Sequence, residues 1–251
     1  MNAQPVTELP PLRGTMAGVK LAFPRTKLDG QESSAANVRY EGEKDWWTAN
    51  PTRHYPVPTQ DTVISDFLII LNRHTFQPIL SKEDLVTFAV SYVRAYGDED
   101  LPPESSRWLR FNFSPDMYSQ GNGQLKRLYE EQTAASAKLL GPLIPRQDEF
   151  GLRKVSSDQE GGAFMKAAAR NVYDTWYFDD RSWQTMIACM RHTDTTSPVK
   201  LSCVHYFVVP ELEAVAAGIY TSTADLTQWK HIEAEFRHRA LSFLVDTPAP
   251  K

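Results

Sequence analysis

The feature that most constrains the fold is a stretch from residue 182 to 209, which carries both cysteines of the chain. It contains two apolar runs rich in β-branched and aromatic residues, separated by a polar segment with a proline, which is typical of a β-hairpin. Cys189 and Cys203 lie equally far from the middle of the turn, so the hairpin would place them opposite each other. A disulfide there would close a loop of about 15 residues and contribute about 3 kcal/mol by the chain-entropy relation.

Two buried free thiols are the alternative, because unpaired cysteine is a common core residue. The choice bears on location, since a structural disulfide indicates an oxidising compartment whereas buried thiols fit the cytoplasm. We expect the disulfide between Cys189 and Cys203.

Composition describes an ordinary globular chain. Its 251 residues are 41% hydrophobic, enough for one large core or two smaller ones. The net charge of -4 provides no basic field for a phosphate backbone, so we expect no nucleic-acid partner. No run approaches the roughly 18 to 20 apolar residues of a membrane span, and the first residues do not resemble a signal peptide. An oxidising location then requires a leader or anchor that has been removed, and membrane contact is expected only through it.

The first half of the chain predicts strands around one helix. Residues 1–60 are rich in Pro, Gly, Ser and charge, and are expected to be extended and loop-rich with one strand near residue 20. The continuous β-branched run at 61–80 predicts a buried strand, a turn and a second short extended piece. A capping sequence at Ser81 followed by apolar residues at helical spacing predicts a helix over 82–96. Alternation at 108–113 predicts another strand.

The second half predicts a meander closed by a helix. Helical spacing at 123–140, ended by Gly141 and Pro142, is followed by strand patterns at 150–156, 172–178, 182–209 and 212–222. The last helix, at 224–245, carries an apolar stripe that should cover one face of the sheet. The stripe consists of Leu226, Trp229, Ile232, Phe236, Ala240 and Phe243.

These elements predict an α+β fold with antiparallel sheets and flanking helices, and two similar lobes are an option because strand-then-helix order recurs. The expected divisions are an extended segment at 1–60, a first α+β lobe at 61–145, and a second lobe at 146–251 with the cysteine hairpin and the closing helix.

Local signatures of catalysis are missing from the sequence, including nucleophile elbows, phosphate loops and H-E-x-x-H. His231, Glu235 and His238 share one helix face and could hold a metal, but that face lies opposite the apolar stripe and should meet water. The pair Asp179 and Asp180 fits a solvated turn. We therefore expect no metal, no cofactor and no catalytic residue.

Two further patterns could carry a nucleophile. His205 follows Cys203 on the same strand face, and a Cys-His pair can make a reactive thiolate, which a disulfide would remove. Ser197 and Lys200 have the S-x-x-K spacing of serine acylases, but they fall in a hairpin turn instead of at a helix start.

The order of features from residue 150 onward resembles immunity proteins encoded beside bacterial type VI secretion effectors, especially those that guard against periplasmic phospholipases. The resemblance covers about the last 100 residues. The residues that carry it are F-G-L-R at 150–153, Y-D-x-W at 173–176, I-x-C at 187–189, C-V-H-Y-F at 203–207 and L-x-x-W-x-x-I-E-x-x-x-R-x-x-x-x-x-F at 226–243.

The resemblance implies a non-enzymatic periplasmic protein that neutralises a cognate toxic effector, a lipase, by blocking its active site or its approach to the membrane. The matched positions are scaffold, so they transfer no binding residues. We expect the contacts at an acidic loop and at the hairpin tip, with Asp98, Glu99, Asp100, Glu104, His192 and Asp194 as candidates. The alternatives are a hydrolase or metal enzyme built from dispersed residues, an envelope accessory or structural protein, and, with free thiols, a cytoplasmic location.

Overall fold

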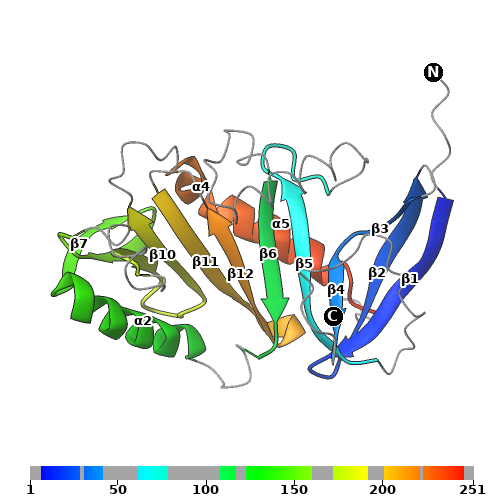
Figure 1. Ribbon diagram of the computed structural model, residues 1–251, viewed down its shortest axis with the longest axis horizontal. Coiled ribbons are helices and arrows are strands. Elements are labelled where there is room, and N and C mark those ends of the chain that lie inside the picture. Colours follow the sequence, from blue (N-terminus) through cyan, green and yellow to red (C-terminus); the bar gives the residue numbers. More distant parts are fainter. Residues whose placement is uncertain are drawn as a thin grey trace.

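Two antiparallel sheets organise the computed structural model (Figure 1). The structure describes residues 7–28, 31–41, 62–78, 108–116, 123–159, 172–191, 201–220 and 223–245. The smaller sheet has the order β1 (Thr7–Met16), β2 (Val19–Leu28) and β3 (Gln31–Ser34). The larger sheet has nine strands in the order β4 (Asn37–Tyr40), β5 (Ile64–Asn72), β6 (Trp108–Ser114), β12 (Ala214–Tyr220), β11 (Leu201–Val209), β10 (Thr185–Arg191), β9 (Thr175–Phe178), β8 (Leu152–Ser156) and β7 (Ile144–Glu149).

The burial of each strand follows its sequence pattern. β11 alternates between buried and partly exposed residues, as its period-two sequence predicts. β5 is buried on both faces over most of its length, which explains its continuous apolar run. A turn after β5 leads to a bridge between Leu71 and Pro78, so the predicted strand, turn and short extended piece at 61–80 are confirmed.

Helices cover the large sheet on both faces. α2 (Gln124–Leu140) begins after Gly123 and ends at Gly141, as predicted. The closing helix is present as α4 (Thr223–Thr227) and α5 (Trp229–Leu241), which Gln228 separates because its backbone leaves the helical region. The predicted stripe is confirmed, since all six of its residues are buried.

The main core lies between α5, the small sheet and one face of the large sheet. Phe236 of α5 packs on Phe111 of β6 at 4.4 Å between ring centroids. Phe23 of β2 lies 5.1 Å from Phe67 of β5 and 4.8 Å from Phe243, which follows α5. A second cluster lies between the opposite face and α2, around Leu125 and Trp176. The α+β prediction is confirmed.

The N-terminal segment contains more strand than its composition predicts. Instead of one strand near residue 20, the chain forms the long hairpin β1–β2 and then β3 and β4. The charged and proline residues of β1 are tolerated because this strand lies at the edge of the small sheet. The buried residues Leu12, Met16, Leu21 and Phe23 connect this hairpin to the main core.

The large sheet is continuous across the predicted lobe boundary, because β6 pairs with β12 from Phe111 and Gly218 to Ser114 and Val215. The division into 1–60, 61–145 and 146–251 stays a prediction. The helix predicted at 82–96 lies outside the described residues. Within the described part of the chain, no helix has the length and apolar character needed to cross a bilayer.

Candidate functional site

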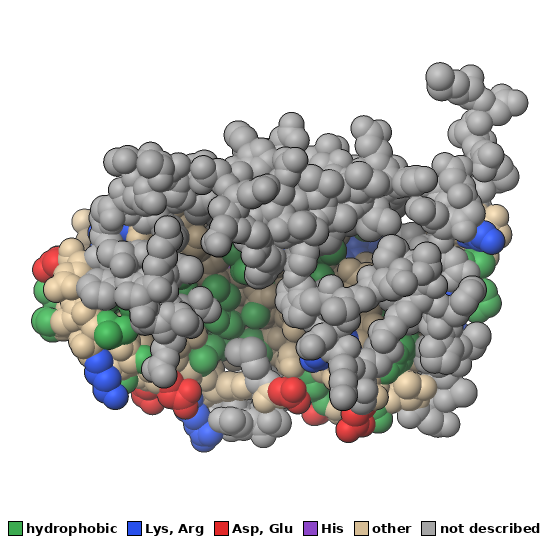
Figure 2. All heavy atoms as spheres, viewed as in Figure 1, with side chains coloured by type: hydrophobic (Ala, Val, Ile, Leu, Met, Phe, Trp, Pro, Cys, Tyr) green, Lys and Arg blue, Asp and Glu red, His purple; other side chains and the backbone are tan. Residues whose placement is uncertain are grey.

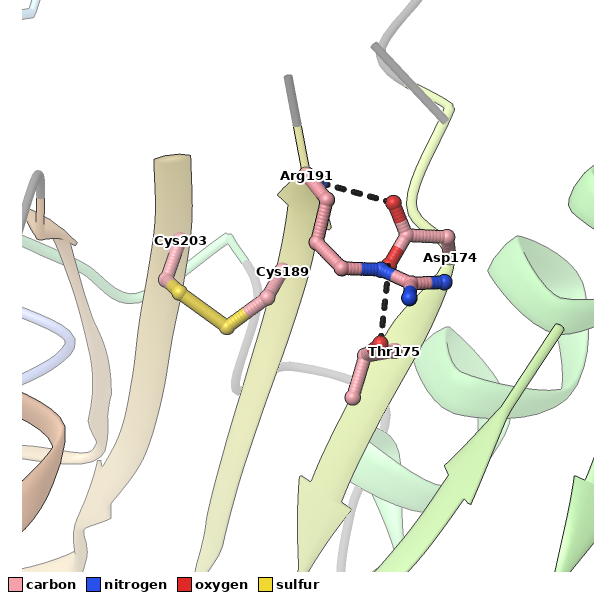
Figure 3. Close-up of a disulfide and its surroundings, with 5 residues drawn as sticks. All are labelled: Asp174, Thr175, Cys189, Arg191 and Cys203. Atoms are coloured by element: carbon pink, nitrogen blue, oxygen red, sulfur yellow. Dashed lines mark hydrogen bonds and ion pairs between the residues drawn. A yellow bond between two sulfur atoms is a disulfide. The ribbon is translucent and has the colours of Figure 1, made fainter. Parts of the chain in front are cut away.

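The cysteine hairpin is a cross-linked part of the core. Cys189 of β10 is the register partner of Cys203 of β11, and their sulfurs form a disulfide of 2.06 Å (Figure 3). The two residues are 0% and 1% exposed. The predicted disulfide is therefore present, and a Cys-His nucleophile at Cys203 is ruled out because its sulfur is already bonded.

A buried carboxylate fixes the end of the same hairpin (Figure 3). Asp174 is fully buried and accepts hydrogen bonds from the Arg191 backbone N–H at 2.7 Å, from Arg191 Nε at 2.9 Å and from Thr175 Oγ1 at 2.8 Å. Arg191 Nη2 also donates to the Ser157 carbonyl at 3.0 Å. The arginine thus ties the end of β10 to the start of β9 and to the residue after β8, which holds this end of the sheet in one register.

His205 lies inside the core, next to α5. Its side chain is 0% exposed, and its Nε2 lies 3.4 Å from Glu233 Oε2. Thr185 Oγ1 donates to Glu233 Oε2 at 2.8 Å, and Arg237 Nη2 donates to Glu233 Oε1 at 3.1 Å and to the Val208 carbonyl at 2.7 Å. The imidazole is enclosed by the core, an arrangement that does not favour the alternative of a hydrolase that uses His205.

The surroundings of this pair lower the pKa of both side chains. Burial lowers the pKa of His205 and outweighs the opposing effect of Glu233, so the imidazole is neutral at pH 7. Burial acts to raise the pKa of Glu233, but its contacts with His205, Thr185 and Arg237 prevail and hold that pKa below its usual range. The network is a neutral histidine beside an ionised, hydrogen-bonded glutamate.

We expect acid to destabilise the protein through His205. A histidine with a lowered folded pKa binds a proton more readily in the unfolded chain, so the stability that it provides is complete above the unfolded pKa of about 6.5 and is lost as the pH falls below it. The free energy of unfolding should therefore fall from pH 7 to pH 5, by up to about 1.4 kcal/mol per pH unit for this one proton. Chemical denaturation of His205→Gln should show a smaller loss over that window.

His238→Gln is the matched control, because His238 lies exposed on α5. It should keep the pH dependence of the natural chain. If the free energy of unfolding falls equally with pH in the natural chain and in His205→Gln, the assignment of a neutral buried imidazole is contradicted.

The predicted metal face of α5 does not assemble a site. His231 and His238 are exposed and Glu235 is partly exposed, as expected for the face opposite the stripe. The His231 ring lies against Phe76 at 4.7 Å between centroids. Among the described residues, no three His, Cys, Asp or Glu side chains converge as metal ligands.

The predicted partner contacts cannot be placed. Asp98, Glu99, Asp100, Glu104, His192 and Asp194 lie outside the described residues, as do Ser197 and Lys200. They stay predictions from the sequence. The described residues nevertheless form two hollows at the β7 end of the large sheet, which the sequence analysis does not anticipate.

The first hollow, here called the apolar groove, runs between α2 and the strands β7 and β8 and has a volume of about 420 Å³. Leu139 of α2 and Ile144 of β7 are 43% and 38% exposed and lie outside the groove lining. The groove is lined by Tyr129, Glu130, Thr133, Ala134, Ala137, Leu143, Pro145 and Val155.

The second hollow, here called the charged hollow, has a volume of about 450 Å³ and lies at the β7–β8 turn. Arg153 donates to Asp180 at 2.8 Å and lies 3.4 Å from Asp148. The Ser182 hydroxyl, against the opposing effect of burial, holds the pKa of Asp179 below its usual range. The hollow is lined by Asp148, Gly151, Leu152, Arg153, Phe178, Asp179, Asp180 and Arg181.

The elements that line both hollows lie at the end of the molecule that holds α2 and β7 (Figure 1). At this end, Figure 2 shows hydrophobic side chains close to acidic and basic ones. The predicted turn at Asp179 and Asp180 is confirmed, because Asp179 accepts the backbone N–H of Arg181 two residues later. What the sequence could not show is that this turn, α2 and the β7–β8 hairpin meet on one surface.

Comparisons with known proteins give one structural likeness. No family model matches the chain, and no curated protein matches it. A solved structure described as Smlt3025, an immunity protein of the Stenotrophomonas maltophilia type IV secretion system, has a TM-score of 0.48 and 10% identity, and the alignment covers 95% of each chain. That description names a type IV system, whereas the sequence resemblance is to proteins that accompany type VI effectors.

Proposed function

We propose that this protein is a non-enzymatic binding protein that neutralises a toxic partner protein, in the manner of immunity proteins encoded beside secreted bacterial toxins. The observation that carries the proposal is the open surface of the apolar groove and the charged hollow at one end of the sheet. Exposed apolar surface rimmed by polar groups is typical of protein interaction sites. The resemblance over the last 100 residues supports the same class.

The framework behind this surface suits a partner that is bound as a rigid body. Most residues that line the apolar groove come from the helix α2 and the strands β7 and β8, which hold side chains more firmly than loops do. The disulfide and the Asp174–Arg191 contacts fix the neighbouring strands. A surface that is already ordered loses little conformational entropy on binding, which favours a tight complex.

The finer proposal concerns the toxin and the compartment. We take the partner to be a lipase or phospholipase effector of a type VI secretion system, and the inhibitor to act by covering its active site or its membrane-binding surface. The Cys189–Cys203 disulfide supports an oxidising compartment such as the periplasm. A protein in the periplasm would meet a toxin that attacks the cytoplasmic membrane from its periplasmic side.

Co-expression tests the proposal. The toxin encoded by the neighbouring gene, directed to the periplasm of a bacterial host, should stop growth alone and lose its toxicity when this chain is directed there with it. The purified pair should form a stable complex in size-exclusion chromatography, and lipase activity should fall with the added protein until a one-to-one ratio is reached. Undiminished toxicity together with no complex would refute the proposed function.

A further inference from the structure

The apolar groove and the charged hollow adjoin each other. Phe178 lines the charged hollow, and its ring lies 4.7 Å from the ring of Tyr129, which lines the apolar groove. Arg153 and Val155 line the charged hollow and the apolar groove respectively, and they point to the same face of β8 because side chains alternate along a strand. The two hollows are therefore neighbours, close enough for one bound segment to contact both.

The charge of this surface is unequal along its length. The charged hollow contains the carboxylates of Asp148, Asp179 and Asp180 and the guanidiniums of Arg153 and Arg181, whereas Glu130 is the one charged residue among those that line the apolar groove. The four carboxylates and two guanidiniums leave a net charge of -2. Arg153 already donates to Asp180 and contacts Asp148, so the remaining acceptor capacity favours further cationic groups.

We infer that the two adjoining hollows dock a segment of the partner protein that presents apolar side chains followed by lysine or arginine side chains. The small side chains Ala134 and Ala137 allow that segment to approach α2 closely, and its apolar groups would cover Leu143, Pro145 and Val155. Its basic groups would lie among Asp148, Asp179 and Asp180. The inference rests on the proposed function and specifies the chemistry of the partner.

The same charges argue against two other occupants. A net negative surface repels the phosphates of a nucleic acid and the head groups of anionic lipids. β7 is also an unsuitable edge for strand addition, because Pro145 lacks an N–H and the register shifts between Arg146 and Glu149. Binding through side chains in the hollows is what this end of the molecule favours.

The test uses two variants of the full chain and two matched controls. Ala134→Arg fills the apolar groove, and the double variant Asp148→Lys/Asp180→Lys reverses the charge of the charged hollow. Ala234→Arg makes the same change as the first variant at an exposed position of α5, and Glu8→Lys reverses a charge on exposed β1. Circular dichroism and thermal unfolding of all four establish that each chain is folded.

Calorimetry then measures the affinity of each chain for the toxin encoded by the neighbouring gene, which tests the docking surface. The two surface variants should each raise the Kd by at least about tenfold, and the two controls should change it by less than about twofold. Hydrogen exchange of the natural complex should show protection in 129–137 and 148–155. A complex with unchanged Kd in both surface variants would overturn the docking surface and leave the proposed function standing, whereas no complex with the natural chain would overturn both.

Discussion

Removal of the disulfide by the double change Cys189→Ala/Cys203→Ala should lower the free energy of unfolding by about 3 kcal/mol. The bond joins residues 14 positions apart, so it restricts a short loop in the unfolded chain, and its removal restores that conformational freedom. Both sulfurs are buried, so lost packing adds to the effect. Equilibrium denaturation in guanidinium chloride would measure the change as a lower midpoint.

Reduction distinguishes the contribution of the cross-link to stability from that of the packing of its two sulfurs. In excess reductant the natural chain should unfold at a lower denaturant concentration, while the midpoint of the double variant should stay where it is. Thiol titration of the denatured natural chain without reductant should find no free thiol. Two free thiols, or a midpoint that ignores the reductant, would contradict the disulfide and remove its support for an oxidising compartment.

Gly218→Ala should destabilise the protein by about 1–3 kcal/mol, because the core has no room for the added methyl group. A Cβ at this position would lie 2.5 Å from three carbons of the Phe111 ring, which is the cross-strand partner of the glycine. The ring cannot easily move, since it is fully buried against Phe236 at 4.4 Å and Phe207 at 5.3 Å. Chemical denaturation should show the loss as a lower midpoint with an unchanged m-value.

A second substitution identifies crowding as the cause. Phe111→Leu makes room beside position 218, so Gly218→Ala should cost less in that background than in the natural one. The double-mutant cycle should therefore give a favourable coupling of about 1 kcal/mol or more. If the losses of stability from the two substitutions are additive, the glycine is needed for a reason other than crowding by Phe111.

Much of the fold is predictable where one periodicity dominates. The cysteine hairpin, β5, β6, α2 and the buried stripe of the closing helix all follow from patterns of apolar residues. The reason is that each of these elements buries one continuous face or both. Their sequences therefore show the apolar periodicity that burial in the core requires.

Strands at sheet edges are harder to predict. β7 has the sequence IPRQDE and is almost wholly exposed, so no apolar alternation identifies it. β1 contains two consecutive prolines and becomes a strand because it pairs with β2 and places Leu12 and Met16 in the core. In both cases a partner strand, instead of local sequence, determines the conformation.

The candidate site could not be predicted because it is assembled from distant segments. Tyr129 of α2, Val155 of β8 and Phe178 of β9 come together only through the order of strands in the sheet. The sequence does contain one indication, the apolar residues of these elements, such as Leu143 and Val155. Such residues are informative only when exposure is known, because most apolar residues in similar positions are buried.

The pairing of β6 with β12 also determines when the sheet can be completed. Partners such as Phe113 and Ala216 are roughly 100 positions apart, so this ladder closes a long loop and is expected to form slowly. Until Ala214–Tyr220 is in place, β6 and β11 each present an open edge that can pair with another chain. The centre of the sheet is thus finished by one of its last strands to be synthesised, and a growing chain leaves those two edges open to aggregation until that strand arrives.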